Sequence, residues 1–418
     1  MARSVSIFDV SGLPFWRRPI FLLFIMAVAM PIAFNVWSAL LNNFVVQVAD
    51  FDGSDIGLLH TVREVPGFLA VGVILLLLII REQTLGLISL AILGIATAIT
   101  AYFPSMTGLL VITLISSFGF HYFETVNQSL QLQWLPKEKA PKIIGWLVGA
   151  GSLATLFAYL GIIVGWQKLG LSFNFLYLSS GGLTALIAVF CLFFFPSFKT
   201  ETKQITKLVM RRRYWLYYAL QFLSGARRQI FVVFAGFMMV EKFGFQVHQL
   251  TALFLINLVI NIFVAPLFGY FIAHFGERRA LLIEYSGLIC VFMAYGGIYL
   301  FDWGVALAAI LFVLDHLFFG LRMALKTYFQ KISAPEDIAP TAAVAFTINH
   351  IAAVFLPVLL GLLWLVSPAI VFMAAAFLAS GFLASAFFAV AFLATAFFAV
   401  AFLATDFFAA VAFGAAPL

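Results

Sequence analysis

Residues 197–213, SFKTETKQITKLVMRRR, form a polar connector inside an otherwise apolar chain. Apolar stretches of about 20 residues, the length that an α-helix needs to cross the hydrocarbon core, lie on both sides of it. We expect spans at 19–41, 55–80, 84–103, 107–134, 142–166 and 173–196, and then at 214–240, 248–274, 280–300, 304–331, 341–366 and 368–390. The sequence therefore predicts an all-α membrane protein of twelve transmembrane helices in two pseudo-symmetric six-helix bundles.

Composition supports a membrane protein. Of the 418 residues, 64% are hydrophobic and 10% are charged, whereas soluble domains carry about 25% charged residues. The net charge of +6 does not indicate a nucleic-acid partner, because the basic residues gather in alternate loops. With the N-terminus inside, the outer loops hold only Lys168 and Lys242 as basic residues. We expect both termini to be cytoplasmic. We also expect the chain to be a monomer that contacts lipid in a cell membrane, most plainly a bacterial inner membrane.

The two halves repeat weak features at an offset of about 200 residues, as internal duplications of transporters do. Phe120 and His121 lie in the fourth span about where Asp315 and His316 lie in the tenth. We therefore divide the chain into a bundle at 1–196, a cytoplasmic linker at 197–213 and a second bundle at 214–390. Residues 391–418 continue an exact decamer repeat and form a low-complexity apolar tail, which is either an additional span or foreign to the fold.

The loop after the eighth span carries the motif GYFIAHFGERR at 269–279. With the six-plus-six arrangement, this loop resembles the major facilitator superfamily of secondary transporters. The resemblance implies alternating access without a cofactor or an enzymatic activity, and it implies a gating role for Gly269, Gly276, Arg278 and Arg279. The match is partial, since Ala273 stands at the acidic position of the family motif. No phosphate-binding loop, nucleophile elbow or zinc-protease motif occurs in the sequence.

Charged and amide side chains interrupt several spans, where a charge costs about 2.5–3.5 kcal/mol on insertion scales. Such residues persist when they face water or each other, so we treat them as candidate functional residues. The predicted substrate-binding residues are Arg63, Arg227, Arg228, Gln128, Gln131, Arg322 and Asn349. The predicted proton-coupling residues are Glu64, His121, Glu124, Asp315 and His316. Glu124 ranks first among the second group, because it shares one face of the fourth span with His121, Gln128 and Gln131.

The buried charges predict the class of solute. Basic residues outnumber acidic ones within the spans, which favours an anionic organic substrate moved by proton-coupled secondary transport. Three alternatives remain open. The same fold could export a divalent metal, with His60 and Glu64 among the ligands, although nearby arginines repel cations. It could export a drug, or it could serve as a membrane sensor or scaffold without transport.

Overall fold

The computed structural model describes residues 4–6, 12–70, 72–135, 140–199, 210–334 and 337–387. The first half contains α1 (Pro19–Gln47), α2 (Gly53–Phe68), α3 (Gly72–Leu77), α4 (Glu82–Ile99), α5 (Met106–Trp134), α6 (Ala140–Leu169) and α7 (Phe173–Phe194). The second half contains α8 (Trp215–Gln229), a π-helical segment (Ile230–Ala235), α9 (Gly236–Glu241), α10 (Val247–Phe275), α11 (Glu277–Leu300), α12 (Val305–Gly320), α13 (Met323–Ile332), α14 (Ile338–Val366) and α15 (Pro368–Phe387). Two short parallel strands, β1 (Ser4–Ser6) and β2 (Ser197–Lys199), pair beside the first bundle. The all-α prediction did not include them.

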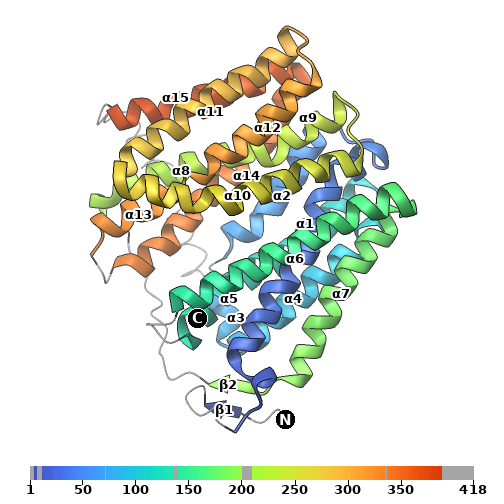
Figure 1. Cartoon of the computed structure of the whole chain (residues 1–418), viewed down its shortest axis with the longest axis vertical. Coiled ribbons are helices and arrows are strands. Elements are labelled where there is room, and N and C mark those ends of the chain that lie inside the picture. The colour runs from blue at the N-terminus through green and yellow to red at the C-terminus, as the bar shows by residue number, and fades with distance from the viewer. Residues whose placement is uncertain are drawn as a thin grey trace, which may run out of the picture.

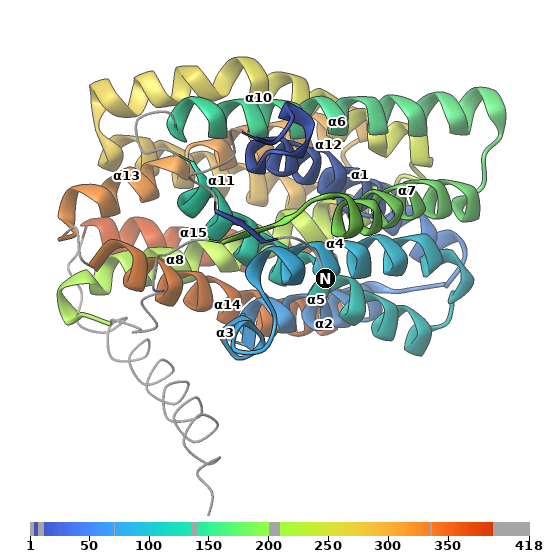
Figure 2. The ribbon, with the colours of Figure 1, turned by 90° about the horizontal axis from the view of Figure 1, so that it is seen from below.

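Each predicted span corresponds to one helix or to helices that continue one another. Ten helical stretches in the described residues are long and apolar enough to cross a membrane. Figure 1 shows the helices of the first half, in blue and green, gathered below those of the second half, in yellow and red. Figure 2 shows the molecule turned by 90° and seen from the side of the first bundle. The predicted membrane fold of two six-span bundles is therefore consistent with the structure.

Three predicted spans are interrupted rather than continuous. The second span breaks between α2 and α3, and Pro66 lies in the last turn of α2. The seventh passes through the π-helical segment directly after Arg227 and Arg228. The tenth breaks between α12 and α13, at Leu321 and Arg322. Irregular backbone inside a span commonly marks a functional region.

The bundles meet along two pairs of helices, α2 with α14 and α6 with α10. We call the end of the molecule that carries β2 and the start of α8 the connector side, and the opposite end the far side. On the far side α2 and α14 pack without a gap. A Cβ atom at Gly57 would overlap the carbonyl of Pro357, and one at Gly361 would overlap the carbonyl of Gly53. Glycine is therefore required for this close approach.

Equivalent contacts in the two bundles support the predicted duplication. At the start of α4, Glu82 accepts a hydrogen bond of 2.8 Å from Gln133 at the end of α5. At the start of α11, Glu277 pairs at 2.7 Å with Lys331 at the end of α13. The predicted linker is anchored at both ends but is described only at 197–199 and 210–213, and the tail at 391–418 lies outside the described residues.

Candidate functional site

A cavity of about 510 Å³ lies between the two bundles. In the first bundle its lining comes from the connector-side halves of α1 and α5 and from α6, and in the second it comes from α10 and α12. Its polar lining residues are Asn35, Glu124, Asn127, Gln128, Gln131, Ser152, Thr155, Tyr159, Asn257, Asn261 and His316. We call this space the central cavity. Its volume falls within the range of about 300–1,000 Å³ that is usual for small-molecule sites.

Most of the polar residues that line the central cavity are neutral hydrogen-bonding groups. Six of its lining residues are asparagines or glutamines, contributed by α1, α5 and α10. Amides both donate and accept hydrogen bonds, so they can orient a solute without a charge on it. Two aromatic residues of the lining face each other across the bundle interface: the ring centres of Tyr159 and Phe254 lie 6.2 Å apart. The arrangement can hold a small solute by hydrogen bonds together with contact to aromatic rings.

Glu124 is the carboxylate of this cavity. It sits on α5 one turn before Gln128, which donates a hydrogen bond to it. Glu124 forms no ion pair with any side chain in the described part of the chain. A carboxylate in a confined space without a cationic partner is well placed to bind a proton or a solute donor. The structure therefore places the first-ranked proton-coupling residue where coupling could occur, together with the predicted residues Gln128, Gln131 and His316.

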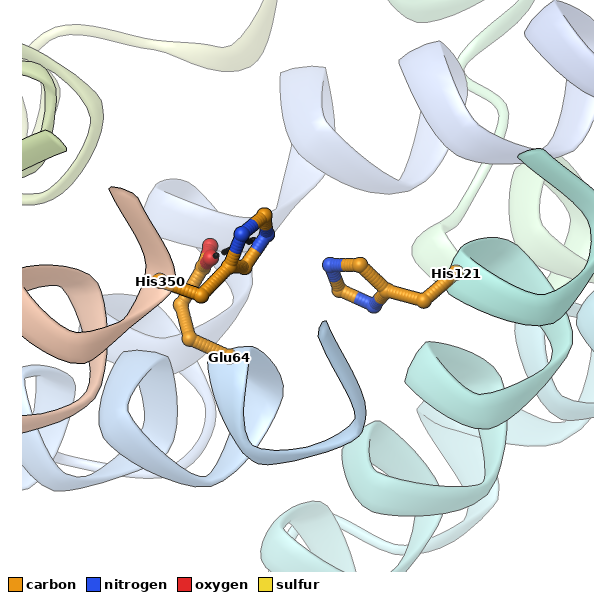
Figure 3. A group of neighbouring side chains, drawn as sticks. All are labelled: Glu64, His121 and His350. Atoms are coloured by element: carbon orange, nitrogen blue, oxygen red, sulfur yellow. Dashed lines mark ion pairs between the residues drawn. The ribbon is translucent and has the colours of Figure 1, made fainter. Parts of the chain in front are cut away.

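A second group of predicted residues converges on Glu64, which is completely buried. Its Oε1 lies 3.1 Å from Nη2 of Arg63, and its Oε2 lies 3.0 Å from Nη2 of Arg228 on α8. Nε2 of His350, on α14, lies 3.6 Å from the same Oε2. Figure 3 shows the ring of His121, on α5, turned towards Glu64 and His350. We call these five residues the Glu64 cluster, and it joins the first bundle to the second.

The Glu64 cluster contains groups that could bind a metal ion. The ligand atoms of Glu64, His121 and His350 all lie within 4.8 Å of one another. However, Arg63 and Arg228 already neutralise the carboxylate, and both guanidinium groups would repel a divalent cation. The cluster is therefore better suited to holding the bundles together than to holding a metal.

Arg227 points away from this cluster and into the second bundle. Its Nη2 lies 3.4 Å from Oε1 of Glu284 on α11, and its Nη1 lies 4.0 Å from Oδ1 of Asp315 on α12. Its guanidinium also lies 4.4 Å from the ring centre of Phe319. We call Arg227, Glu284 and Asp315 the Arg227 triad. The adjacent arginines of α8 therefore take different roles, one across the bundle interface and one inside a bundle.

The remaining predicted residues form no ion pair with these groups among the described residues. Arg322 is exposed at the break between α12 and α13, with its guanidinium 4.1 Å from the ring centre of Phe319. Asn349 donates a hydrogen bond of 3.0 Å to the carbonyl of Gln221 within the second bundle. Gly269 lies within α10, and Gly276 has a φ of 85° between α10 and α11, a conformation that favours glycine. Arg278 and Arg279 follow at the start of α11, and the gating role of this loop stays a prediction.

Sequence reasoning missed several residues of these sites. Asn257 and Asn261 line the central cavity from α10, and their spacing of four residues in an apolar span was a usable signal. Glu284 was overlooked because it lies near the start of its span, where an acidic residue is usually read as interfacial. Nothing in the sequence placed it beside Arg227.

The comparisons with known proteins agree with this architecture. The chain is similar in structure to a mutant of the nucleoside transporter NupG (15% identity, 91% of this chain and 99% of that chain covered, TM-score 0.73) and to NupG itself (16%, 88% and 98%, 0.68). It is also similar to a bacterial homologue of the human lysosomal transporter Spinster in an inward-facing, unoccupied conformation (13%, 93% and 97%, 0.64). No curated protein sequence matches the chain significantly. Residues 21–357 match the sequence profile of the Major Facilitator Superfamily, so the chain belongs to that superfamily of transporters.

Proposed function

We propose that this protein is a proton-coupled secondary transporter of a small neutral organic solute with several hydrogen-bonding groups. The observation that carries the proposal is the polar lining of the central cavity, in which six of the eleven residues are amides and the carboxylate of Glu124 forms no ion pair with a described residue. A neutral solute gains hydrogen bonds from these amides without leaving a buried charge unpaired. Two structural neighbours are described as nucleoside transporters, so nucleosides are the first solutes to test.

Glu124 is the proposed coupling group. When its carboxylate takes up a proton, the cavity loses its negative charge, and the bundles can then close around the solute with less desolvation. Loss of the proton on the other side of the membrane restores the charge and favours release. His316, which also lines the cavity, offers a second titratable group on the opposite bundle.

An anionic solute is the second candidate, and Arg322 favours it. This guanidinium is exposed and forms no ion pair with a carboxylate in the part of the chain that the structure describes. However, Arg63 and Arg228 are both paired with Glu64, Arg227 is paired inside the second bundle, and none of the three lines the cavity. The surplus of positive charge inferred from the sequence is therefore largely absent from the cavity, which makes a neutral solute the better fit.

Proteoliposome uptake with an imposed pH gradient tests the proposal. Nucleosides and other neutral polar solutes form one arm of the experiment, and organic acids form the other. We expect the gradient to drive accumulation of a neutral solute, and we expect Glu124→Gln to abolish that accumulation while solute exchange across the membrane continues. Asp302→Asn is the control, because Asp302 is an acidic residue that pairs with Lys242 outside the cavity.

Three results would count against this proposal. Accumulation of organic acids alone, lost in Arg322→Gln, would support the anionic candidate. Full gradient-driven accumulation by Glu124→Gln would remove Glu124 from coupling. Binding of solute without any flux would support a sensor.

A further inference from the structure

We propose that the Arg227 triad is a proton-binding site inside the second bundle, in which Glu284 and Asp315 together hold one proton beside Arg227. This site is separate from the central cavity and does not depend on the solute or on Glu124. It gives Glu284 a role that its position in the sequence does not indicate.

The first argument is burial. The side chains of Arg227, Glu284 and Asp315 are 3%, 1% and 0% exposed, respectively. They come from α8, α11 and α12, so the site forms only when the second bundle is folded. Buried ionised groups require opposite charges close by, because the interior solvates them poorly.

The second argument is charge balance. One guanidinium can neutralise one carboxylate, so two ionised carboxylates would leave a net negative charge in the bundle interior. An arginine stays protonated in proteins, and the adjustment must therefore come from the acids. One proton held by the two carboxyl groups together makes the triad neutral.

The third argument is incomplete hydrogen bonding. All four carboxyl oxygens of Glu284 and Asp315 lack a hydrogen bond from any residue that the structure describes. The same holds for Nε, Nη1 and Nη2 of Arg227. Buried polar atoms seldom remain unpaired, and a bound proton would supply a donor that the site lacks.

The surrounding groups do not remove the imbalance. Arg228 is bonded to Glu64. Arg322 attracts Glu284 electrostatically, but its side chain is exposed and it forms no ion pair with a described residue, so it neutralises Glu284 only in part. Tyr285 and Tyr295, on α11, lie near Glu284 and Asp315 respectively, and both are neutral phenols. His316 follows Asp315 in the chain and lines the central cavity, so it provides a route by which a proton could reach the triad.

Infrared spectroscopy of the purified protein tests the proposal, because a protonated carboxyl group has a carbonyl absorption that a carboxylate lacks. The parent protein for the experiment is Glu124→Gln, so that the cavity carboxylate does not contribute. In this background we expect Glu284→Gln and Asp315→Asn each to remove the absorption of one protonated carboxyl group at neutral pH. Either change leaves a single carboxylate, which then pairs with Arg227. Glu277→Gln, on the same helix as Glu284, should remove only carboxylate absorption.

If the carbonyl absorption persists in either variant, the one-proton arrangement is wrong. Titration of the parent alone provides a measurement that needs no further variant. Raising the pH should convert one protonated carboxyl group to a carboxylate, and a spectrum without any protonated carboxyl at neutral pH would overturn the proposal.

We also expect the double variant of Glu284 and Asp315 to melt at a lower temperature than either single variant, since Arg227 is left unpaired. Replacing Arg227 by Gln in the double variant should raise the melting temperature again. Equal melting temperatures for the single and double variants would contradict the pairing with Arg227.

Discussion

The ion pair between Glu64 and Arg228 is expected to stabilise the conformation in which the far side is closed. The pair crosses from α2 to α8 at 3.0 Å, and its carboxylate is completely buried. Coulomb attraction at this distance is about 5 kcal/mol with an effective dielectric constant of about 20. Arg63 still neutralises Glu64 when Arg228 is lost, and the side chain of Arg228 is 22% exposed. We therefore expect Arg228→Gln to weaken the closed conformation by about 2–3 kcal/mol, after desolvation offsets part of the attraction.

A change of this size shifts the equilibrium between two conformations by about 30- to 150-fold, since about 1.4 kcal/mol corresponds to a factor of ten. Spin labels at Tyr102 and Phe301, which are exposed at the far side in different bundles, would report the shift as longer distances. The native cysteines Cys191 and Cys290 would first be replaced by serine. We expect pulsed electron resonance of Arg228→Gln to show a new population with a greater separation.

Lys242→Met is the matched control, because Lys242 pairs at 3.0 Å with Asp302 within the second bundle. It should leave the distance distribution unchanged. The reasoning is refuted if Arg228→Gln also leaves it unchanged. It is refuted equally if Glu64→Gln and Arg228→Gln have additive effects, because a direct pair requires the second substitution to cost less in the presence of the first.

Three further predictions concern packing, pH and the cavity. Gly57→Leu should hold the far side open, because its side chain would overlap Pro357 where α2 meets α14, and the same labels should report it. Burial opposes ionisation of Asp337, at the connector side, but hydrogen bonds from Arg211, Tyr214 and Arg213 outweigh it and lower its pKa. The ionised Asp337 carboxylate therefore stabilises the folded protein above the pKa that Asp337 has in the unfolded chain, and this stabilisation is lost as the pH falls through its pKa in the folded protein. Asp337→Asn should lower the melting temperature at pH 7, and in acid the melting temperatures of the variant and the wild type should converge. Asn127→Leu should reduce the affinity for a neutral solute about 5- to 150-fold, the cost of about 1–3 kcal/mol for leaving one buried polar group of the solute unpaired, without altering its pH dependence.

Some of the candidate site could be predicted from residue spacing alone. Glu124, Gln128 and Gln131 share a face of one helix by their spacing, and the structure places all three along the central cavity. The adjacent arginines at 227 and 228 had to point in different directions, because neighbouring residues of a helix lie about 100° apart. That geometry does not say which helix supplies the partner of either arginine.

The sequence by itself determined the membrane class, the six-plus-six order of the spans and the residues for which lipid is an unfavourable neighbour. These properties follow from local composition, because a span depends on its own length and hydropathy. Only the tertiary structure decided that Arg228 meets Glu64 across the bundle interface and that Arg227 meets Glu284 and Asp315 within one bundle. Such partners lie on helices far apart in the chain, and helical periodicity sets the face on which a charge lies without setting the helix that packs against that face.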